Sequence, residues 1–419
     1  MSTANASADV IVVGAGLAGL VCAHDLGLAG YQCTVLEGSD GVGGRVRTDL
    51  VDGFRLDRGF QIVSTNYPQV IDRLDLDALA VGTFAPGALV RVGNQMHRVA
   101  DPLRQPRQLW STLRAPVGTF ADRVRLLRLV VDVRTHSVVE LLRRPDTSTS
   151  RRLTDAGFTP TMIELLWRPL FAGIQLDPDL EVSRRRFDVI LRMLASGRAG
   201  VPRLGMGAIP EQLAAKLPAD SIRLGATVRA IDGTTVELAD GERQHARAVV
   251  VATDGPAAHR LLGSNVADPG SRAVACCWFS TTDAPWTDPV IALDGTSEGP
   301  ARNLAVLTHV SRSYAPPGVS LIAAAVPGAD ALDPSVTARV RAQLASWFGS
   351  TTNDWTHLRT DVIAHGQPDQ RPPLHPRQRV NLGDGVFVCG DHRDTASIQG
   401  AMFSGERTAI AVAAHLAAG

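Results

Sequence analysis

The stretch at residues 10–45 constrains the fold of this chain more than any other. The apolar run VIVV at 10–13 predicts a buried parallel strand. A glycine-rich turn follows, then a helix-like segment at 17–30 and a second strand at 32–36. This order of strand, glycine turn, helix and strand predicts a βαβ unit that binds a dinucleotide.

Each glycine of the turn has a physical reason. Gly14 permits a tight turn, Gly16 lets backbone N–H groups approach a pyrophosphate, and Gly19 lets the helix pack close to the strand. The unpaired N–H groups and the dipole at a helix N-terminus favour an anion there. The predicted phosphate-binding residues are therefore Gly14, Gly16, Leu17, Ala18 and Gly19.

The second strand ends at an acidic residue. Glu37 lies 23 residues after Gly14 and is placed to accept hydrogen bonds from the ribose hydroxyls. This placement favours an adenosine without a 2′-phosphate. Gly38, the next residue, belongs to the same predicted binding site.

Composition limits the possible functions and locations. With 419 residues the chain is long enough for two domains, and a net charge of zero gives no electrostatic case for binding nucleic acid. Five cysteines without a C-x-x-C pair favour a reducing, cytoplasmic setting. The first residues lack the positive charge of a signal peptide, and the apolar run from residue 10 to residue 23 is too short to span a bilayer. Any membrane contact is therefore expected to be peripheral.

A turn with the sequence G-G-R separates FAD from NAD as the expected cofactor. Gly43, Gly44 and Arg45 follow the acidic residue closely, and an arginine there can reach the pyrophosphate as a fork-shaped donor. With this element the sequence resembles the flavin-dependent amine oxidase superfamily, which includes monoamine oxidases, protoporphyrinogen oxidases and carotenoid desaturases. The resemblance implies that FAD is bound through the G-G-R turn.

Further segments match the same family. By resemblance, Gly59, Phe60, Gln61 and Ile62 would line the isoalloxazine ring, although Phe60 stands where monoamine oxidases have a second glycine and an ordinary strand end remains an alternative. The segment GMGAIPEQL at 205–213 resembles a turn that returns the chain to the FAD domain. In the following predicted strand, at 223–231, Val228 would present its backbone to the adenine.

The C-terminal segment resembles the family closely. A strand at 385–389 ends at Gly390 and Asp391, and a helix opens near Ile398. The resemblance implies that Asp391 approaches the ribityl and pyrophosphate groups, and that the backbone N–H of Ile398 faces the pyrimidine edge of the flavin. A positive helix dipole at that edge stabilises an anionic reduced flavin.

Motifs at both ends and in the middle of the chain predict a discontinuous FAD domain. We expect an α/β, Rossmann-type FAD-binding domain with an inserted α+β substrate-binding domain. The FAD domain is assigned to residues 1–85, 205–264 and 369–419, and the substrate domain to residues 86–204 and 265–368.

The substrate domain is expected to be helical from about residue 85, with breaks at prolines such as Pro102. Its segment 120–144 has helical periodicity and many arginines, which indicates either a solvated face or a basic surface that contacts anionic lipid. The aromatic turn at 167–173 fits a cavity wall and core packing equally well.

Two absences bear on the chemistry. Many amine oxidases of the resembled family place a lysine near flavin N5, but the only lysine here, Lys216, falls in an expected surface helix. Aromatic rings that frame an amine are also scarce, since Tyr31, Tyr67 and Tyr314 are the only tyrosines. The S-G-G-C motif of covalent flavin is missing and Cys389 reads as a core residue, so non-covalent FAD is expected.

We therefore expect an FAD-dependent oxidoreductase that takes hydride from a mostly apolar small molecule and is reoxidised by O₂ or a quinone. Amine oxidation is the first alternative, and a flavin-bound isomerase is a minor one. A non-redox binding protein similar to the Rab GDP-dissociation inhibitors stays open as a different class. No spacing marks a catalytic side chain, and His365 and His392 are the nearest candidates.

Overall fold

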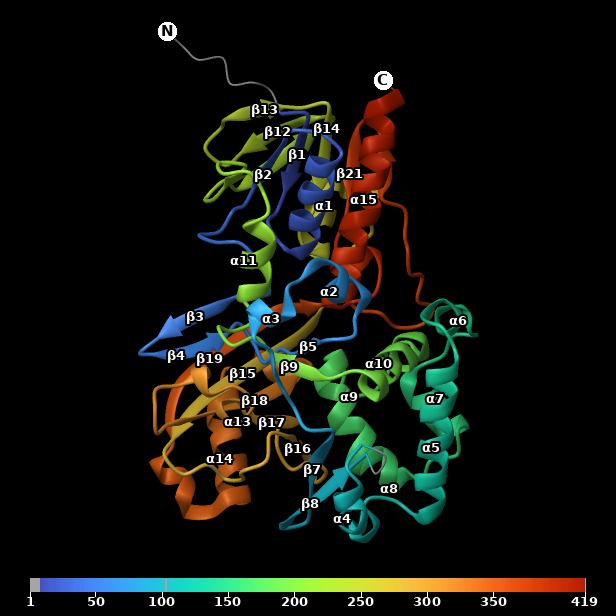
Figure 1. The fold of residues 1–419 in the computed structure, drawn as a ribbon, viewed down its shortest axis with the longest axis vertical. Helices are drawn as coiled ribbons and strands as arrows, with labels where there is room; N and C mark the ends of the chain where they lie inside the picture. Colours follow the sequence, from blue (N-terminus) through green and yellow to red (C-terminus); the bar gives the residue numbers. More distant parts are fainter. Residues whose placement is uncertain (1–7, 102–103, 419) are drawn as a thin grey trace.

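The computed structural model describes residues 8–101 and 104–418. Figure 1 shows two parts stacked along the long axis, with the first strand, β1, and the last helix, α15, in the upper part. Pro102 and the N-terminal segment 1–7, for which a helix break and the lack of a signal peptide were expected, lie outside the described residues.

A six-stranded sheet forms the centre of the upper part, in the order β10-β2-β1-β14-β21-β20. Central β1 pairs in parallel with β2 and β14, so that Val10 lies opposite both Cys33 and Ala248. Only β20, at one edge, runs antiparallel to its neighbour. The strands are β1 (Val10–Val13), β2 (Cys33–Leu36), β10 (Ile222–Arg223), β14 (Ala248–Val251), β20 (Asn381–Gly383) and β21 (Val386–Val388).

Alternate residues of β1 point to two different layers. Val10 and Val12 pack in a core with α1 (Leu17–Leu28) and α15 (Ile398–Ala418). The residues between them, Ile11 and Val13, pack against a three-stranded antiparallel sheet. Because both faces are covered, every residue of β1 is buried, which explains its uninterrupted apolar sequence. The covering strands are β11 (Val228–Asp232), β12 (Thr235–Leu238) and β13 (Arg243–His245).

The lower part is built on a seven-stranded sheet in the order β19-β15-β18-β17-β16-β7-β8. One face packs against α14 (Val336–Phe348). The other face turns Cys276, Trp278 and Ala323 toward the core of the upper part. The strands are β7 (Gly87–Val92), β8 (Gln95–Ala100), β15 (Arg272–Thr281), β16 (Ile291–Asp294), β17 (Asn303–Val306), β18 (Ser320–Pro327) and β19 (Thr356–Gln367).

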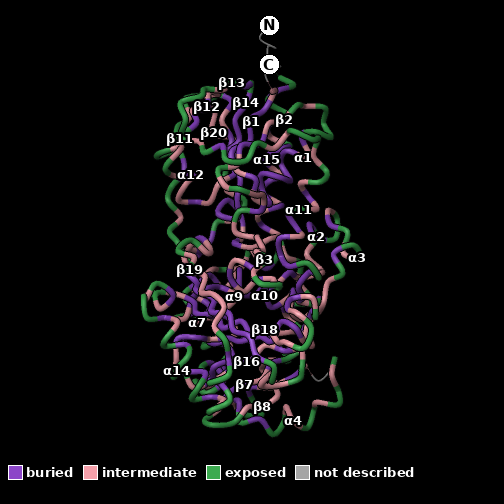
Figure 2. Tube along the Cα trace, turned by 90° about the vertical axis from the view of Figure 1, so that its left-hand side faces the viewer, coloured by how far each residue is buried: buried purple, intermediate pink, exposed green. Residues whose placement is uncertain are grey.

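A helical lobe flanks this sheet, at the right of Figure 1. Trp167 is 2% exposed and contacts the rings of Phe158, Phe171 and Phe187, so the aromatic turn at 167–173 contributes to the core. The helices of the lobe are α4 (Leu109–Arg114), α5 (Phe120–Thr135), α6 (Val138–Arg143), α7 (Thr149–Asp155), α8 (Pro160–Met162), α9 (Arg168–Gln175) and α10 (Arg184–Ser196). Figure 2 shows buried (purple) segments in both parts, around β1 and β14 in the upper part and around β16 and β18 in the lower part.

Several further strands and helices are short. They are β3 (Thr48–Val51), β4 (Phe54–Asp57), β5 (Val63–Ser64), β6 (Gly82–Thr83), β9 (Ala199–Val201), α2 (Pro68–Arg73), α3 (Leu76–Leu79), α11 (Ala208–Ala214), α12 (Gly255–Leu262) and α13 (Leu307–Val310). The two parts confirm the expected fold class, a Rossmann-type domain with an inserted α+β part. The residues at which the two domains are assigned to begin and end stay a prediction.

Two local expectations are wrong. The chain does not turn helical at residue 85, because 87–100 forms the hairpin β7–β8, and β7 pairs in parallel with β16. The single strand expected at 223–231 is two strands in two sheets, since β10 pairs with β2 and β11 pairs with β12.

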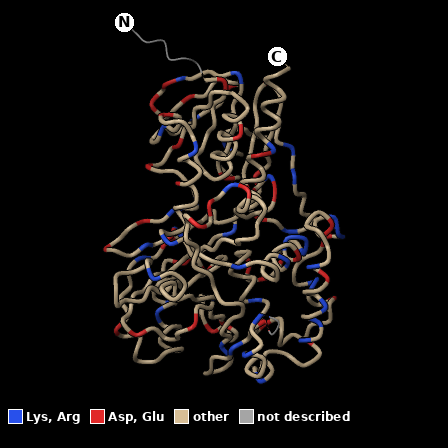
Figure 3. Tube along the Cα trace, viewed as in Figure 1, with Lys and Arg blue, Asp and Glu red and all other residues tan. Residues whose placement is uncertain are grey.

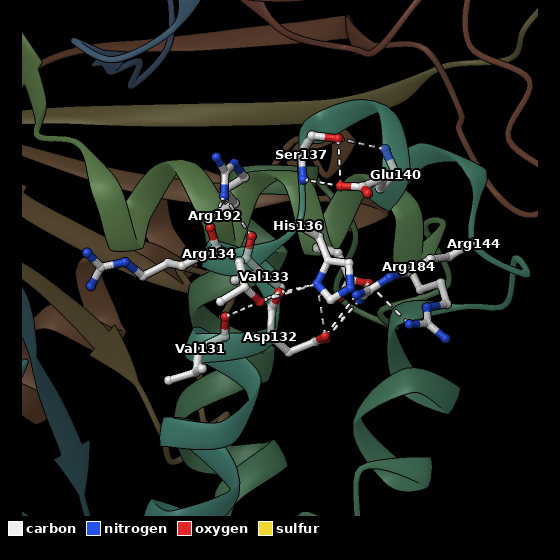
Figure 4. Close-up of polar contacts among 12 residues, drawn as sticks. Val131, Asp132, Val133, Arg134, His136, Ser137, Glu140, Arg144, Arg184 and Arg192 are labelled. Atoms are coloured by element: carbon white, nitrogen blue, oxygen red, sulfur yellow. Dashed lines mark hydrogen bonds and ion pairs between the residues drawn. The ribbon is translucent and has the colours of Figure 1, made fainter.

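The helical segment at 120–144 is also interrupted. Ser137 starts a new helix through a capping box, in which its hydroxyl accepts the N–H of Glu140 and its own N–H donates to the Glu140 carboxylate. Figure 4 shows this cap beside Asp132, which lies 2.8 Å from Arg144. Arg192 of α10 donates to the carbonyls of the last turn of α5. Arg144 of the segment and Arg192 of the neighbouring helix therefore hold the lobe together, while Arg128, Arg134 and Arg143 are exposed.

Candidate functional site

The turn between β1 and α1 has the geometry of an anion cradle. A Cβ on Gly19 would lie 2.0 Å from the carbonyl oxygen of Gly14, so only glycine lets the helix come this close. At Gly16 a Cβ would meet no atom within 4 Å, which leaves open space beside the backbone. No side chain caps α1, and no acidic residue lies in its first turn. Its first N–H groups, at Leu17, Ala18 and Gly19, are thus placed for an anion.

The G-G-R turn packs directly on this cradle. The N–H of Gly43 donates to the carbonyl of Ala15 at 2.8 Å, and a Cβ on Gly44 would lie 3.6 Å from the Cα of Gly16. Gly43 has φ +111°, and a Cβ there would come within 2.3 Å of the Val46 carbonyl oxygen. The two glycine motifs therefore form one surface.

Glu37 lies at the other side of the cradle. Its Oε2 accepts the N–H of Ala15 at 2.7 Å, and its Oε1 accepts the N–H and hydroxyl of Ser39. The Glu37 carbonyl accepts the N–H of Ala226 at 2.8 Å, which brings Val228 and Gly38 to the same end of the site. The structure thus brings together the residues predicted to bind the adenosine.

Arg45 and Asp391 form an ion pair at 2.7 Å, although 346 positions separate them. Arg45 also donates to the carbonyl of Gly366 at 2.8 Å. Burial disfavours the charged form of Asp391, but the Arg45 guanidinium outweighs it and holds the pKa of this carboxyl below its usual range. The binding of the pyrophosphate by Arg45 stays a prediction, because in this structure the Arg45 guanidinium donates to Asp391 and to the carbonyl of Gly366.

The segment 59–62, predicted to line the flavin ring, sits between the two parts. A Cβ on Gly59 would lie 2.8 Å from the Cδ1 of Ile363 in β19. The amide of Gln61 donates to the carbonyls of Arg45 and Arg58, which ties this segment to the G-G-R turn. Phe60 and Ile62 pack on the apolar core that includes one face of the large sheet.

The N-terminus of α15 completes the predicted site. Ser397 caps the helix by accepting the N–H of Gly400 at 2.9 Å, while Ile398 is the first helical residue. Gly390 has φ +148° and donates to the Ser404 hydroxyl, which holds the Gly-Asp turn against the helix. Cys389 is fully buried, in agreement with its assignment to the core.

The sequence reasoning missed two buried charged residues. Asp57, fully buried at the end of β4, accepts hydrogen bonds from Thr48, the N–H of Met206 and Tyr314. Burial raises the pKa of this carboxyl to about 6. Arg186 of α10 is 3% exposed. A signal existed for Arg186, which lies one turn from buried Ile190 on the same helix. For Asp57 there was none, because the alternation of Phe54 and Leu56 places it on the opposite face of the strand, with Arg55.

The side chains of the only lysine and of two of the three tyrosines are engaged elsewhere. Lys216 donates to the carbonyl of Arg73 and lines a surface cavity of about 300 Å³ with Leu28, at the opposite end of α1 from the glycine turn. Tyr31 donates to the Ala413 carbonyl and Tyr314 to Asp57. The remaining tyrosine, Tyr67, follows Ile62 by five residues.

These residues fit FAD on observations of the protein itself. The open space at Gly16 and the uncapped α1 suit a pyrophosphate. Near Asp391 two buried polar groups have atoms without a hydrogen-bond partner among the described residues, namely Nη1 of Arg186 and both ring nitrogens of His392. Burial lowers the pKa of His392 to about 4, so its ring is neutral. Such orphaned groups are rare in proteins and suit a polar ligand.

Comparison with known proteins supports this assignment. A family model described as flavin containing amine oxidoreductase matches residues 17–413. Phytoene dehydrogenase from Streptomyces griseus is 29% identical over 321 residues, which cover 67% of this chain and 61% of that protein. Putrescine oxidase from Kocuria rosea is 45% identical over 67 residues, or 16% of this chain and 14% of that protein. The chain thus spans less than two thirds of the length of these relatives.

Solved structures share the fold along their whole length. Cyclohexylamine oxidase from Brevibacterium oxydans superposes with a TM-score of 0.73 at 17% identity, covering 98% of this chain and all of that one. An oxidoreductase from Methanosarcina mazei gives a TM-score of 0.71 at 16% identity, covering 95% of this chain and 99% of that one. At these identities the likeness concerns the fold alone.

Proposed function

Because this chain belongs to the family of flavin-containing amine oxidoreductases, we propose that it is an FAD-dependent oxidoreductase acting on a mostly apolar small molecule. We infer the substrate class from how much of the chain one sequence match covers. The similarity to phytoene dehydrogenase covers 67% of this chain, whereas the matches to putrescine oxidase and to two L-amino-acid oxidases cover 16% and 38%. Only the first extends over most of the chain, so it favours dehydrogenation of a carbon skeleton.

The surroundings of the predicted ring segment support an apolar substrate. Phe60 and Ile62 pack on the core formed with Trp278 and Ala323 of the large sheet. Lys216 lies at the far end of α1, and two of the three tyrosines donate to protein groups elsewhere. Among the described residues, the only lysine thus lies away from the predicted ring segment, which supports an apolar substrate over a simple amine.

The protein's part in this chemistry is to bind, orient and exclude water. Non-covalent FAD, when bound, would accept the hydride at N5 while the substrate releases a proton, and O₂ or a quinone would reoxidise it. Apolar side chains at 60 and 62 would align a C–H bond and keep the site dry. The Arg45–Asp391 pair and the cap by Ser397 hold the segments around the cofactor in place.

The purified protein should be yellow, and its flavin band near ~450 nm should bleach under anaerobic titration with a polyene such as phytoene or with a reduced tetrapyrrole. Acid precipitation should release the flavin, because its attachment is non-covalent. A panel of mono- and diamines is the matched comparison. Bleaching by amines alone would replace this proposal with amine oxidation. A colourless protein that cannot be reconstituted with FAD would leave a binding protein of the GDP-dissociation-inhibitor kind.

For localisation we propose a cytoplasmic protein that touches anionic membranes through one corner of the helical lobe. We call Leu109, Trp110, Leu113 and Phe120 the α4–α5 corner; Trp110 and Phe120 are 69% and 72% exposed. Arg123 of α5 donates to the carbonyls of Thr112 and Ala115, which joins the two helices. Exposed Arg107 precedes α4 and exposed Arg114 is its last residue, and basic residues are spread over the lobe in Figure 3. Among the described helices, none has the length and hydropathy to cross a bilayer.

The replacement of both Trp110 and Phe120 by Ser tests this surface. We expect the wild-type protein to sediment with vesicles that contain anionic lipid, and the double variant to lose at least about tenfold in partitioning, because two large apolar side chains no longer enter the interface. Leu50→Ser, at a residue that is 69% exposed on the β3–β4 hairpin, is the matched control. Equal sedimentation of the two variants, or none by the wild type, would refute the membrane contact.

A further inference from the structure

Arg186 is a buried cation with an unused donor. It is 3% exposed, and its Nη2 donates to Oε1 of Gln367 at 2.5 Å and to the carbonyl of Ala396 at 2.8 Å. Its Nη1 is buried and has no hydrogen-bond partner among the described residues. A buried charge without an anionic partner is costly, so a protein keeps one where something else supplies the partner.

The acids nearest in electrostatic effect already have their own arginines. The nearby phenol of Tyr67 favours the charged form of Arg186 most, followed by Asp391 and Asp177. Tyr67 is not a carboxylate, and the two acids are already paired, Asp391 with Arg45 at 2.7 Å and Asp177 with Arg272 at 2.9 Å. Burial lowers the pKa of Arg186 to about 10, so the guanidinium is still protonated at neutral pH. Among the described residues, no carboxylate therefore lies within ion-pair distance of the Arg186 guanidinium, and its positive charge is not balanced.

The position of this charge coincides with the predicted flavin site. Ala396, whose carbonyl holds Nη2, lies two residues before Ile398, the first residue of α15. Gln367, the other acceptor, is fixed by its own bond to the carbonyl of Ile174 and lines a small cavity with Arg45 and Asp391. Arg186 thus joins α10, β19 and the N-terminus of α15 at one point.

We propose that Arg186 directs its free Nη1 at the pyrimidine edge of FAD and, together with the N-terminus of α15, concentrates positive charge there. This inference rests on the proposed FAD-dependent function and names a residue that tunes the cofactor. The pyrimidine edge offers carbonyl and ring-nitrogen acceptors, and it gains negative charge on reduction. A positive group at that edge stabilises the reduced cofactor more than the oxidised one, and so favours hydride transfer to it.

The test is the midpoint potential of the bound flavin in Arg186→Gln and Arg186→Met. Loss of the charge should weaken binding of reduced FAD relative to oxidised FAD at least tenfold, which lowers the two-electron potential by about 30 mV. Arg186→Lys keeps the charge and should lie between these variants and the wild type. Arg185→Gln is the matched control, because Arg185 precedes it on α10 and also donates to two backbone carbonyls.

The outcomes separate this inference from the proposed function. Arg186→Met serves where the glutamine variant fails to fold, since an apolar side chain leaves no buried amide that needs hydrogen-bond partners. A potential that is unchanged in both variants, or one that falls equally in Arg185→Gln, would overturn the inference even if the enzyme oxidises its substrate. An unchanged potential with a raised KM for carboxylate-bearing substrates would assign the charge to the substrate instead. A protein that never binds FAD would overturn both proposals.

Discussion

Gly16→Ala should lose FAD while keeping its fold. A Cβ at this position meets no protein atom within 4 Å, and the backbone, at φ −72° and ψ 174°, is open to any residue. The added methyl would occupy the space that the proposed pyrophosphate needs beside the first N–H groups of α1. We expect the dissociation constant of FAD to rise at least about 100-fold, or about 3 kcal/mol. Quenching of FAD fluorescence during reconstitution of the apoprotein measures it.

Gly27→Ala is the matched control on the same helix. A Cβ at Gly27 also meets no atom within 4 Å, but this residue lies near the other end of α1. Alanine should stabilise the helix there by up to about 1 kcal/mol and leave FAD affinity unchanged. Because Gly16 is the N-cap residue of α1, Gly16→Ala should lower the free energy of unfolding of the apoprotein by only about 1 kcal/mol. If Gly16→Ala binds FAD as tightly as the wild type, the glycine turn is not the pyrophosphate site.

Asp57→Ala should destabilise the protein by about 3 kcal/mol or more. The fully buried carboxylate accepts hydrogen bonds from the hydroxyls of Thr48 and Tyr314 and from the N–H of Met206, which joins β3, β4 and the turn before α11. Alanine would leave these three buried donors without an acceptor, at a cost of about 1–3 kcal/mol for each that finds no water. Thermal unfolding of the variant measures the loss, with Asp52→Asn in the exposed β3–β4 turn as the control.

Asp57→Asn should have the opposite effect at neutral pH. Burial raises the pKa of Asp57 from the usual 3.8 to about 6, so between these values the folded state binds more protons than the unfolded state. The stability contributed by this group therefore falls as the pH rises from about 4 to about 6, and the full penalty, on the order of 3 kcal/mol, remains above pH 6. Asparagine retains an acceptor oxygen and carries no charge. It should unfold at a higher temperature than the wild type at pH 7, but not at pH 4. An equal difference at both pH values would contradict the raised pKa.

Several predictions from sequence rested on local backbone requirements, and these are confirmed. The VIVV strand, the helix after Gly16 and the second strand lie where the spacing placed them, at β1, α1 and β2. Gly19 specifies a close approach of the helix to Gly14 that any other residue would alter, so the requirement is visible in a few adjacent residues. The same holds for the Gly-Asp turn before α15.

Long-range pairing decided what the sequence could not. The hairpin β7–β8 joins a sheet through β16, about 200 residues later, and the segment 223–231 divides between two sheets because its two halves have different partners. No local sequence pattern specifies which distant strand pairs with a given strand.

The sequence by itself determined the nucleotide fold and the cofactor class, because glycines and caps act through short-range sterics. Only the tertiary structure decided which charges are buried and which are paired. Asp57 accepts hydrogen bonds from three donors, and Arg45 pairs with Asp391, which lies near the other end of the chain. Nη1 of Arg186 has no hydrogen-bond partner among the described residues. A pKa or an unpaired charge depends on every element that packs around the group, and this environment exists only when distant segments have come together.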